Sequence, residues 1–267
     1  MSYLSKFGYA AVAMPRTTLR PGQILLHQNG ALVSPSPLTS IFEPDGGLRP
    51  PIVSDDRPAA GLNGVSTDRL DLNLGLSILG SFITAIGGSL GFKFAFNNSK
   101  RIEFVYDDVQ ESILGYPDSS GSVEENFNKI DLYLRDAEMN AGPALMDEIR
   151  QNDLYLTTAV VKSKKMKVKA TDSRGHDVAV DVPTIQGIVG GNVKVTSANS
   201  VDSTVSFEGD TLLVFGIRPV RLFFKDGAYQ IARSAPDVRV RSLLPPGAST
   251  DSREVLISER SPVIRVG

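Results

Sequence analysis

Few side chains in this 267-residue chain are of the types that carry out covalent or metal chemistry. Cysteine is absent, so there is no thiolate nucleophile, disulfide, Cys-ligated zinc or site for S-acylation. Histidine occurs only at His27 and His176, far apart and without acidic companions at ligand spacing, so a metal site would require folding to unite them. Two histidines also leave few ways to build a Ser-His-Asp triad, and no Gly-x-Ser-x-Gly elbow is present.

Phosphate-binding and carboxylate motifs are equally scarce. There is no Walker loop, and the glycine-rich stretch 87–91 lacks the spacing and strand-to-helix order of a dinucleotide fingerprint. Adjacent acids occur at Asp107-Asp108 and Glu124-Glu125, but neighbouring carboxylates on one element usually form a solvated face. We therefore expect no enzymatic activity and no cofactor, although an enzyme with an unfamiliar site would show no motif.

A lysine cluster is the most distinct charged feature. The formal net charge of -2 gives no overall attraction to nucleic acid or anionic membranes, so an electrostatic partner must meet a local patch. The lysines could protect a solvated strand from aggregation, or contact anionic lipid head groups at on the order of 1 kcal/mol each. No aromatic residues alternate with them for base stacking, so nucleic acid is not an expected partner. The cluster comprises Lys162, Lys164, Lys165, Lys167 and Lys169.

The elements that position these residues follow from hydrophobic periodicity and turn residues. With 41% hydrophobic and 22% charged residues, the composition is that of an ordinary soluble globular protein. Residues 34–64 form a long surface excursion, and loops of this length tend to be mobile or functional. Helices are predicted at 2–7, 38–42, 76–86, 123–138, 143–150 and 182–189. Strands are predicted at 9–14, 24–27, 68–73, 91–96, 101–106, 153–170, 191–207, 211–224 and 228–232.

An uncharged stretch at 72–92 is long enough on paper to span a bilayer. It is interrupted by several glycines, however, and its helical portion is too short to cross. Leu76, Leu79, Ile83 and Ile86 recur at helical spacing. The favoured interpretation is a buried helix over 76–86 that packs against a sheet.

The clearest period-2 pattern in the chain lies at 91–106 and predicts a β-hairpin. Such alternation suits a half-buried sheet, and it also suits a membrane barrel strand, which is apolar outside and polar inside over about ten residues. Replacing Phe94 and Phe104 with Asp should abolish membrane leakage and leave the fold mostly intact if the hairpin inserts. The apolar faces of its two strands are Phe92, Phe94 and Phe96, then Ile102, Phe104 and Tyr106.

The C-terminal segment differs in character from the rest. Residues 1–235 are expected to form one domain, whereas 236–267 is rich in proline and arginine and is too short to fold alone. Its apolar patches suggest that this tail lies against the body. They are Leu243, Leu244, Val255, Leu256, Ile257, Val263 and Ile264.

In their order along the chain, several segments resemble the bacterial gasdermins. These are a Gly-Tyr opening strand, PGQILL at 21–26, LGSFIT at 79–84, the Phe-rich hairpin with VQE at 109–111, LYLTTAVVKSK at 154–164, EGDTLLVFG at 208–216 and the short tail. The resemblance implies a twisted, mainly antiparallel sheet with packed helices, similar to a gasdermin N-terminal domain.

The resemblance also implies a pore-forming effector of anti-phage cell death by abortive infection. Such a protein is cytoplasmic while a C-terminal peptide inhibits it; a partner protease removes the peptide, and the body oligomerises and inserts a β-barrel into the inner membrane. Transferred to this chain, the hairpins would come from 91–106 and from 155–170 with 193–207. The inhibitory peptide would lie within 243–267, and Arg239 and Arg241 would be candidate cleavage sites.

One departure from the family pattern is the missing N-terminal cysteine, which many bacterial members acylate. Here Met1, Ser2, Tyr3 and Leu4 open the chain. Either insertion proceeds without acylation, or the first turn itself supplies the hydrophobic contact. An α+β binding or scaffold module without membrane activity, and an unrecognised hydrolase, remain the alternatives.

Overall fold

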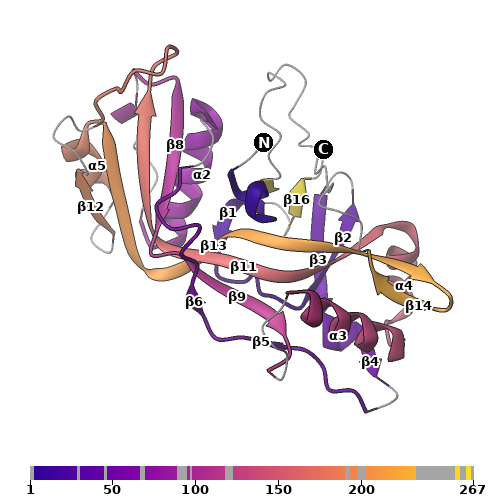
Figure 1. Cartoon of the computed structure of the whole chain (residues 1–267). Coiled ribbons are helices and arrows are strands. Elements are labelled where there is room, and N and C mark those ends of the chain that lie inside the picture. The colour runs from indigo at the N-terminus through magenta and orange to yellow at the C-terminus, as the bar shows by residue number, and fades with distance from the viewer. Residues whose placement is uncertain are drawn as a thin grey trace.

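Two long antiparallel strands form the spine of the protein. The computed structural model shows β11 (Asp153–Thr171) paired with β13 (Thr204–Lys225) over almost their whole lengths. In Figure 1 they run side by side from the lobe with α2 and α5 to the lobe with α3 and α4. The structure describes residues 3–28, 31–44, 47–66, 70–88, 95–96, 98–117, 123–189, 193–197, 203–232, 256–258 and 263–265.

Bulges allow this spine to bend. The β11–β13 register shifts between Thr157 and Ala159, between Val161 and Lys162, and between Ser163 and Lys165. Each extra residue increases the local twist of a strand pair. The strand predicted to end at 208–210 therefore continues without a break through Thr204–Lys225, and the prediction of two separate strands there was wrong.

Shorter strands pair with the spine on both sides, all antiparallel within the described residues. The partners of β11 are β2 (Gln23–Gln28), β8 (Arg101–Asp107) and β9 (Gln110–Gly115). The partners of β13 are β1 (Ala10–Arg16), β12 (Lys194–Ser197) and β14 (Ala228–Ile231). The sheet extends from β2 through β3 (Ala31–Pro37) to β16 (Val263–Arg265) and β15 (Leu256–Ser258). Outside β8 and β9 lie β5 (Ile52–Val53), β6 (Arg57–Pro58) and β7 (Leu70–Asp71), and β4 (Phe42–Pro44) pairs separately with β10 (Ala137–Met139).

Helices cover the sheet in two lobes, each with its own hydrophobic core. The first core contains α2 (Leu72–Ala85) and α5 (Val182–Val189), and the second contains α1 (Leu38–Ile41), α3 (Val123–Asp136) and α4 (Pro143–Gln151). A short 3-10 helix, η1 (Tyr3–Phe7), opens the chain. The α+β, mainly antiparallel fold predicted from the sequence is confirmed.

The uncharged stretch folds as the predicted buried helix. Asp71 caps α2 by accepting a hydrogen bond from the Asn73 backbone N–H at 2.9 Å. Leu76, Leu79, Ile83 and Ile86 are buried, as the helical spacing indicated, and Phe82 is fully buried beside them. Within the described part of the chain, no helix combines the length and apolar character needed to cross a membrane.

Of the hairpin predicted at 91–106, the described residues contain the second strand. This strand is β8, with Ile102, Phe104 and Tyr106 buried on one face as expected. The strand predicted before it is wrong at Ala95 and Phe96, which form a 3-10 turn, while Phe92 and Phe94 lie outside the described residues. The strands that pair with β8 are instead β11 and β7.

Gly75 lets α2 approach β8 closely, and this contact can be tested. A Cβ at Gly75 would lie 2.8 Å from the Ile102 Cβ, whereas one at Gly187 in α5 would meet nothing within 4 Å. We expect Gly75→Ala to lower the free energy of unfolding by about 1–3 kcal/mol through overpacking. Gly187→Ala should raise it by about 0.5–1 kcal/mol, since alanine favours helix. Urea denaturation of both variants checks this, and equal effects would contradict the tight α2–β8 contact.

Candidate membrane-inserting sheet

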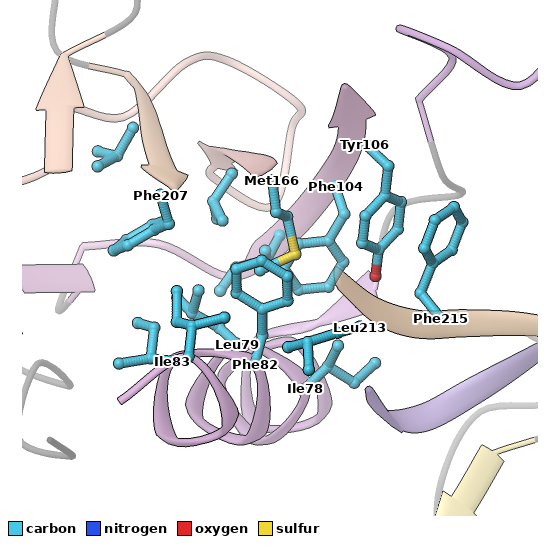
Figure 2. Close-up of a cluster of buried hydrophobic side chains, with 14 of the residues drawn as sticks. Ile78, Leu79, Phe82, Ile83, Phe104, Tyr106, Met166, Phe207, Leu213 and Phe215 are labelled. Carbon is cyan, nitrogen blue, oxygen red and sulfur yellow. The ribbon is translucent and has the colours of Figure 1, made fainter. Parts of the chain in front are cut away.

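The first lobe contains a continuous apolar sheet face, built by alternate residues of three neighbouring strands. Figure 2 shows Phe104 and Tyr106 of β8, Met166 of β11, and Phe207 and Leu213 of β13 gathered over Leu79, Phe82 and Ile83 of α2. Tyr106 stacks on Phe215 with ring centroids 3.8 Å apart. We call this face the α2-covered face; its strand residues are Ile102, Phe104, Tyr106, Met166, Val168, Ala170, Val205 and Phe207, all buried.

Three lysines of the cluster, Lys165, Lys167 and Lys169, lie on the opposite face of β11. Met166 and Val168 are buried, whereas Lys165, Lys167 and Lys169 between and beside them are partly exposed, as alternation predicted. The same three strands thus present an apolar face to α2 and a polar face to water. This sheet is amphipathic in the sense that a membrane strand requires.

Carboxylates from other segments neutralise part of the lysine cluster. The Lys162 ammonium lies 2.6 Å from Asp56, Lys167 lies 2.7 Å from Asp107, and Lys169 lies 3.0 Å from Asp177. Exposed ion pairs of this kind contribute about 1 kcal/mol or less each. Among the described residues, no carboxylate forms such an ion pair with Lys164 or Lys165. Head-group contact by the lysines stays a prediction, and in this state it competes with these carboxylates.

A partly buried polar network joins the N-terminal segment to the sheet. The Tyr9 hydroxyl donates to Glu111 of β9, which also accepts from Arg57 at 3.1 Å and Arg218 at 3.5 Å. The Arg218 guanidinium lies 4.4 Å from the centroid of the Tyr9 ring, a cation–π contact. Burial raises the pKa of the Tyr9 hydroxyl, and this effect is larger than the opposing effect of the Arg218 charge. Tyr9 therefore stays a neutral donor. Sequence reasoning missed this network because its members are single residues without a periodic signal.

The residues considered for catalysis or metal binding are not brought together. The backbone of His27 in β2 is paired with that of Asp153 at one end of β11. His176 lies in the turn beyond the other end of β11, and its ring is 3.2 Å from the Asp172 carboxylate. Asp107 pairs with Lys167. Glu124 and Glu125 lie in the first turn of α3, where negative charge is favourable. Among the described residues, no three His, Cys, Asp or Glu side chains are grouped as a metal site would need.

The C-terminal segment contributes two short strands to the edge of the sheet. Val263, Ile264 and Arg265 of β16 pair with Val33, Leu32 and Ala31 of β3. β15 pairs with β16 and lies against β1, and Leu256 and Ile257 belong to it. The other predicted tail residues, Leu243, Leu244 and Val255, and the candidate cleavage sites Arg239 and Arg241 lie outside the described residues.

Comparison with known proteins identifies the family of this chain. Residues 12–228 match the model of the Bacterial Gasdermin Family. The chain is a bacterial gasdermin. It is 34% identical over 255 residues to Gasdermin bGSDM of Lysobacter enzymogenes, covering 93% of this chain and 90% of that protein. It is 35% identical over 231 residues to Gasdermin bGSDM of a Desulfuromonadales bacterium, covering 86% and 83%.

The fold of this gasdermin also matches a solved structure. The bacterial gasdermin from Bradyrhizobium tropiciagri superposes with a TM-score of 0.59 at 15% identity, over 85% of this chain and 88% of that one. The predicted family and fold are therefore confirmed. Family membership supports a pore-forming function for this gasdermin.

One expectation about the hairpin must be corrected. Phe104 is only 1% exposed beneath α2, so the prediction that Phe104→Asp spares the fold was wrong. We expect Phe104→Asp to lower the free energy of unfolding by more than about 3 kcal/mol, because it buries a carboxylate without a partner. Val105→Asp is the matched control, since Val105 lies on the other face, opposite Lys167, and should change stability by less than about 1 kcal/mol. If urea denaturation shows similar losses of stability for the two variants, the burial of Phe104 in the α2-covered face is contradicted.

Proposed function

We propose that this gasdermin is a pore-forming cell-death effector, inhibited by its C-terminal segment until a partner protease removes it. The body then oligomerises and inserts β-strands into the inner membrane. The observation that carries the proposal is the α2-covered face, an uninterrupted apolar surface on three adjacent antiparallel strands whose other face is polar. Strands enter lipid only as a closed barrel, because every backbone donor and acceptor must be paired there.

The strands that carry this face supply the length that a barrel needs. A tilted membrane strand takes about 9–11 residues. β11 has 19 residues and β13 has 22, so each exceeds this length before any rearrangement. The first inserting hairpin would come from 91–106, with the lipid-facing residues Phe92, Phe94, Phe96, Ile102, Phe104 and Tyr106. The second would come from 155–170 with 193–207, and most of it lies along β11, β12 and β13.

The C-terminal segment, 236–267, is the proposed inhibitor of the 1–235 body. Support comes from β16, which closes the outer edge of β3, and from β15, which lies against β1. Among the described residues, β16 pairs with β3 at three positions only, and we expect a single cut upstream to let the segment dissociate. Arg239 and Arg241 precede these strands and would suit a protease that cleaves after basic residues. Leu243, Leu244 and Val255 would add apolar contacts.

The lysine cluster is proposed to contact anionic lipid head groups once the strands rearrange. Lys162 and Lys169 pair with Asp56 and Asp177, which lie outside the three sheet strands. Rearrangement of those segments would release both ammonium groups. Contact with an anionic leaflet would then offset the lost ion pairs, since each lysine near the surface contributes on the order of 1 kcal/mol.

The biological role that fits this pore-forming function is anti-phage defence by abortive infection. The inactive form would be cytoplasmic, and the cut form would assemble as a homo-oligomer in the inner membrane and kill the infected cell. With no cysteine to acylate, the first turn is the available anchor. Leu4 of η1 is buried, whereas Phe7 is 41% exposed and could contact lipid directly.

Dye release from anionic liposomes tests the proposed function. The full chain would carry a specific protease site after Arg241, so that the tail is removed after folding. We expect no release before cutting and rapid release afterwards, because cutting frees the inhibited body. Adding the 242–267 peptide in excess should slow the release. A cut protein that stays folded but neither binds liposomes nor releases dye would contradict pore formation and favour a binding module.

A further inference from the structure

The segment that contains Asp56 covers the outer edge of β8 and β9. We call residues 52–66 the edge strap. It runs antiparallel to the two strands, with β5 beside the end of β9, β6 beside its start, and Ser66 bridged to Val105 of β8. Beyond it, β7 continues along β8 to Arg101. The described residues 52–66 and 70–71 thus follow this edge from Gly115 back to Arg101.

Backbone hydrogen bonds attach the strap along this edge. The backbone N–H of Ser54 donates to the Ile113 carbonyl at 2.8 Å, and that of Ala59 donates to Val109 at 2.9 Å. The Gly64 N–H donates to the Tyr106 carbonyl at 3.0 Å. The opposite edges of β8 and β9 already pair with β11. The strap therefore satisfies groups that would otherwise offer a template for another strand.

Side-chain contacts fix the strap to two strands at once. Asp56 accepts hydrogen bonds from Ser112 of β9 at 2.5 Å and from Lys162 of β11 at 2.6 Å. Burial opposes ionisation of Asp56, but these two hydrogen bonds outweigh it and hold the pKa of the carboxyl below its usual value. Arg57 adds its ion pair with Glu111.

The strap is nevertheless attached mainly by polar contacts at the surface. Its strands β5 and β6 have two residues each, and Ile52 and Val53 are exposed. Leu62 is its one large apolar side chain in the core. Exposed polar contacts contribute little individually, and a proline at Pro58 is typical of an edge that avoids regular pairing. Separation of the strap would therefore take Leu62, and no other large apolar side chain of the strap, out of the core of the α2 lobe.

We propose that the edge strap is a second inhibitory element, independent of the C-terminal segment. It occupies the edge on which β8, a strand of the first proposed hairpin, must accept another pore strand, and it extends along the neighbouring β9. It detaches before the barrel closes. The proposal rests on the proposed pore-forming function. It follows from the topology: β11 holds one edge of β8 and β9, so any new strand has to enter on the side that the strap covers. After tail removal, the strap must still detach before leakage begins.

A reversible disulfide tests the strap. The chain has no cysteine, so Asp56→Cys with Ser112→Cys introduces the only possible disulfide, between side chains that touch. The full chain with the protease site after Arg241 is oxidised, then cut in the presence of anionic liposomes. We expect dye release at least tenfold slower than for the same protein in reducing agent, with liposome binding retained. Equal release by the oxidised and reduced forms overturns the proposal.

The matched control places a disulfide where no rearrangement is required. Glu43 and Glu138 are paired residues of β4 and β10, both exposed, in the second lobe. Glu43→Cys with Glu138→Cys should release dye at the wild-type rate in the oxidised form. If this disulfide blocks release equally, the strap has no specific role. Failure of the cut wild-type protein to release dye would instead refute pore formation itself.

A loosened strap gives an independent readout if the cysteine variant folds poorly. Arg57 is more than half exposed, and Arg57→Ala removes its ion pair with Glu111 without opening the core. We expect dye release after cutting to be about fivefold faster, the factor that corresponds to a contact of about 1 kcal/mol. Lys129→Ala, which removes the ion pair with Glu125 on α3, should leave the rate unchanged. Unchanged release by Arg57→Ala would overturn the proposal.

Discussion

Contact between α2 and the apolar face of β8, β11 and β13 is the interaction on which the other features depend. Buried apolar surface contributes roughly 25 cal/mol per Å², so this face cannot remain open to water. α2 covers it with Leu79, Phe82 and Ile83 and carries no charge. A lipid bilayer could cover the same face in place of α2, because both are apolar. Exchange of one cover for the other would expose little apolar surface, provided that the two events are coupled.

Strand edges impose the second constraint, because unpaired backbone groups are costly in lipid and invite aggregation in water. In this structure the edge strap covers β8 and β9, and β16 covers β3. These two covers are far apart in the sequence and belong to different segments. In the mechanism that we propose, both covers must leave before the strands can pair with new neighbours. Because the strap and β16 belong to different segments, assembly depends on two separate events.

Local periodicity predicted the elements well where one pattern covered a whole element. The helix predicted at 182–189 and the long strand at 153–170 match α5 and β11 closely. The turn inferred at 208–210 was wrong, because long-range pairing with β11 carries β13 through Gly209. The strap and the Tyr9–Glu111 network had no signal, since backbone pairing by an irregular segment and contacts between residues 102 positions apart leave no period. The sequence therefore indicated the strands that we propose to insert and the C-terminal segment that we propose to inhibit them, but not the edge strap.

The central claim is that the face now packed on α2 faces lipid in the pore. Single cysteines along β11 of this cysteine-free chain, at Met166, Lys167, Val168 and Lys169, can carry an environment-sensitive fluorophore. After tail removal on liposomes, we predict alternation. Labels at 166 and 168 should be quenched by spin-labelled lipid, and labels at 167 and 169 by aqueous iodide, as a barrel strand requires. Quenching by iodide alone at all four positions would show that β11 stays outside the bilayer and would contradict the account.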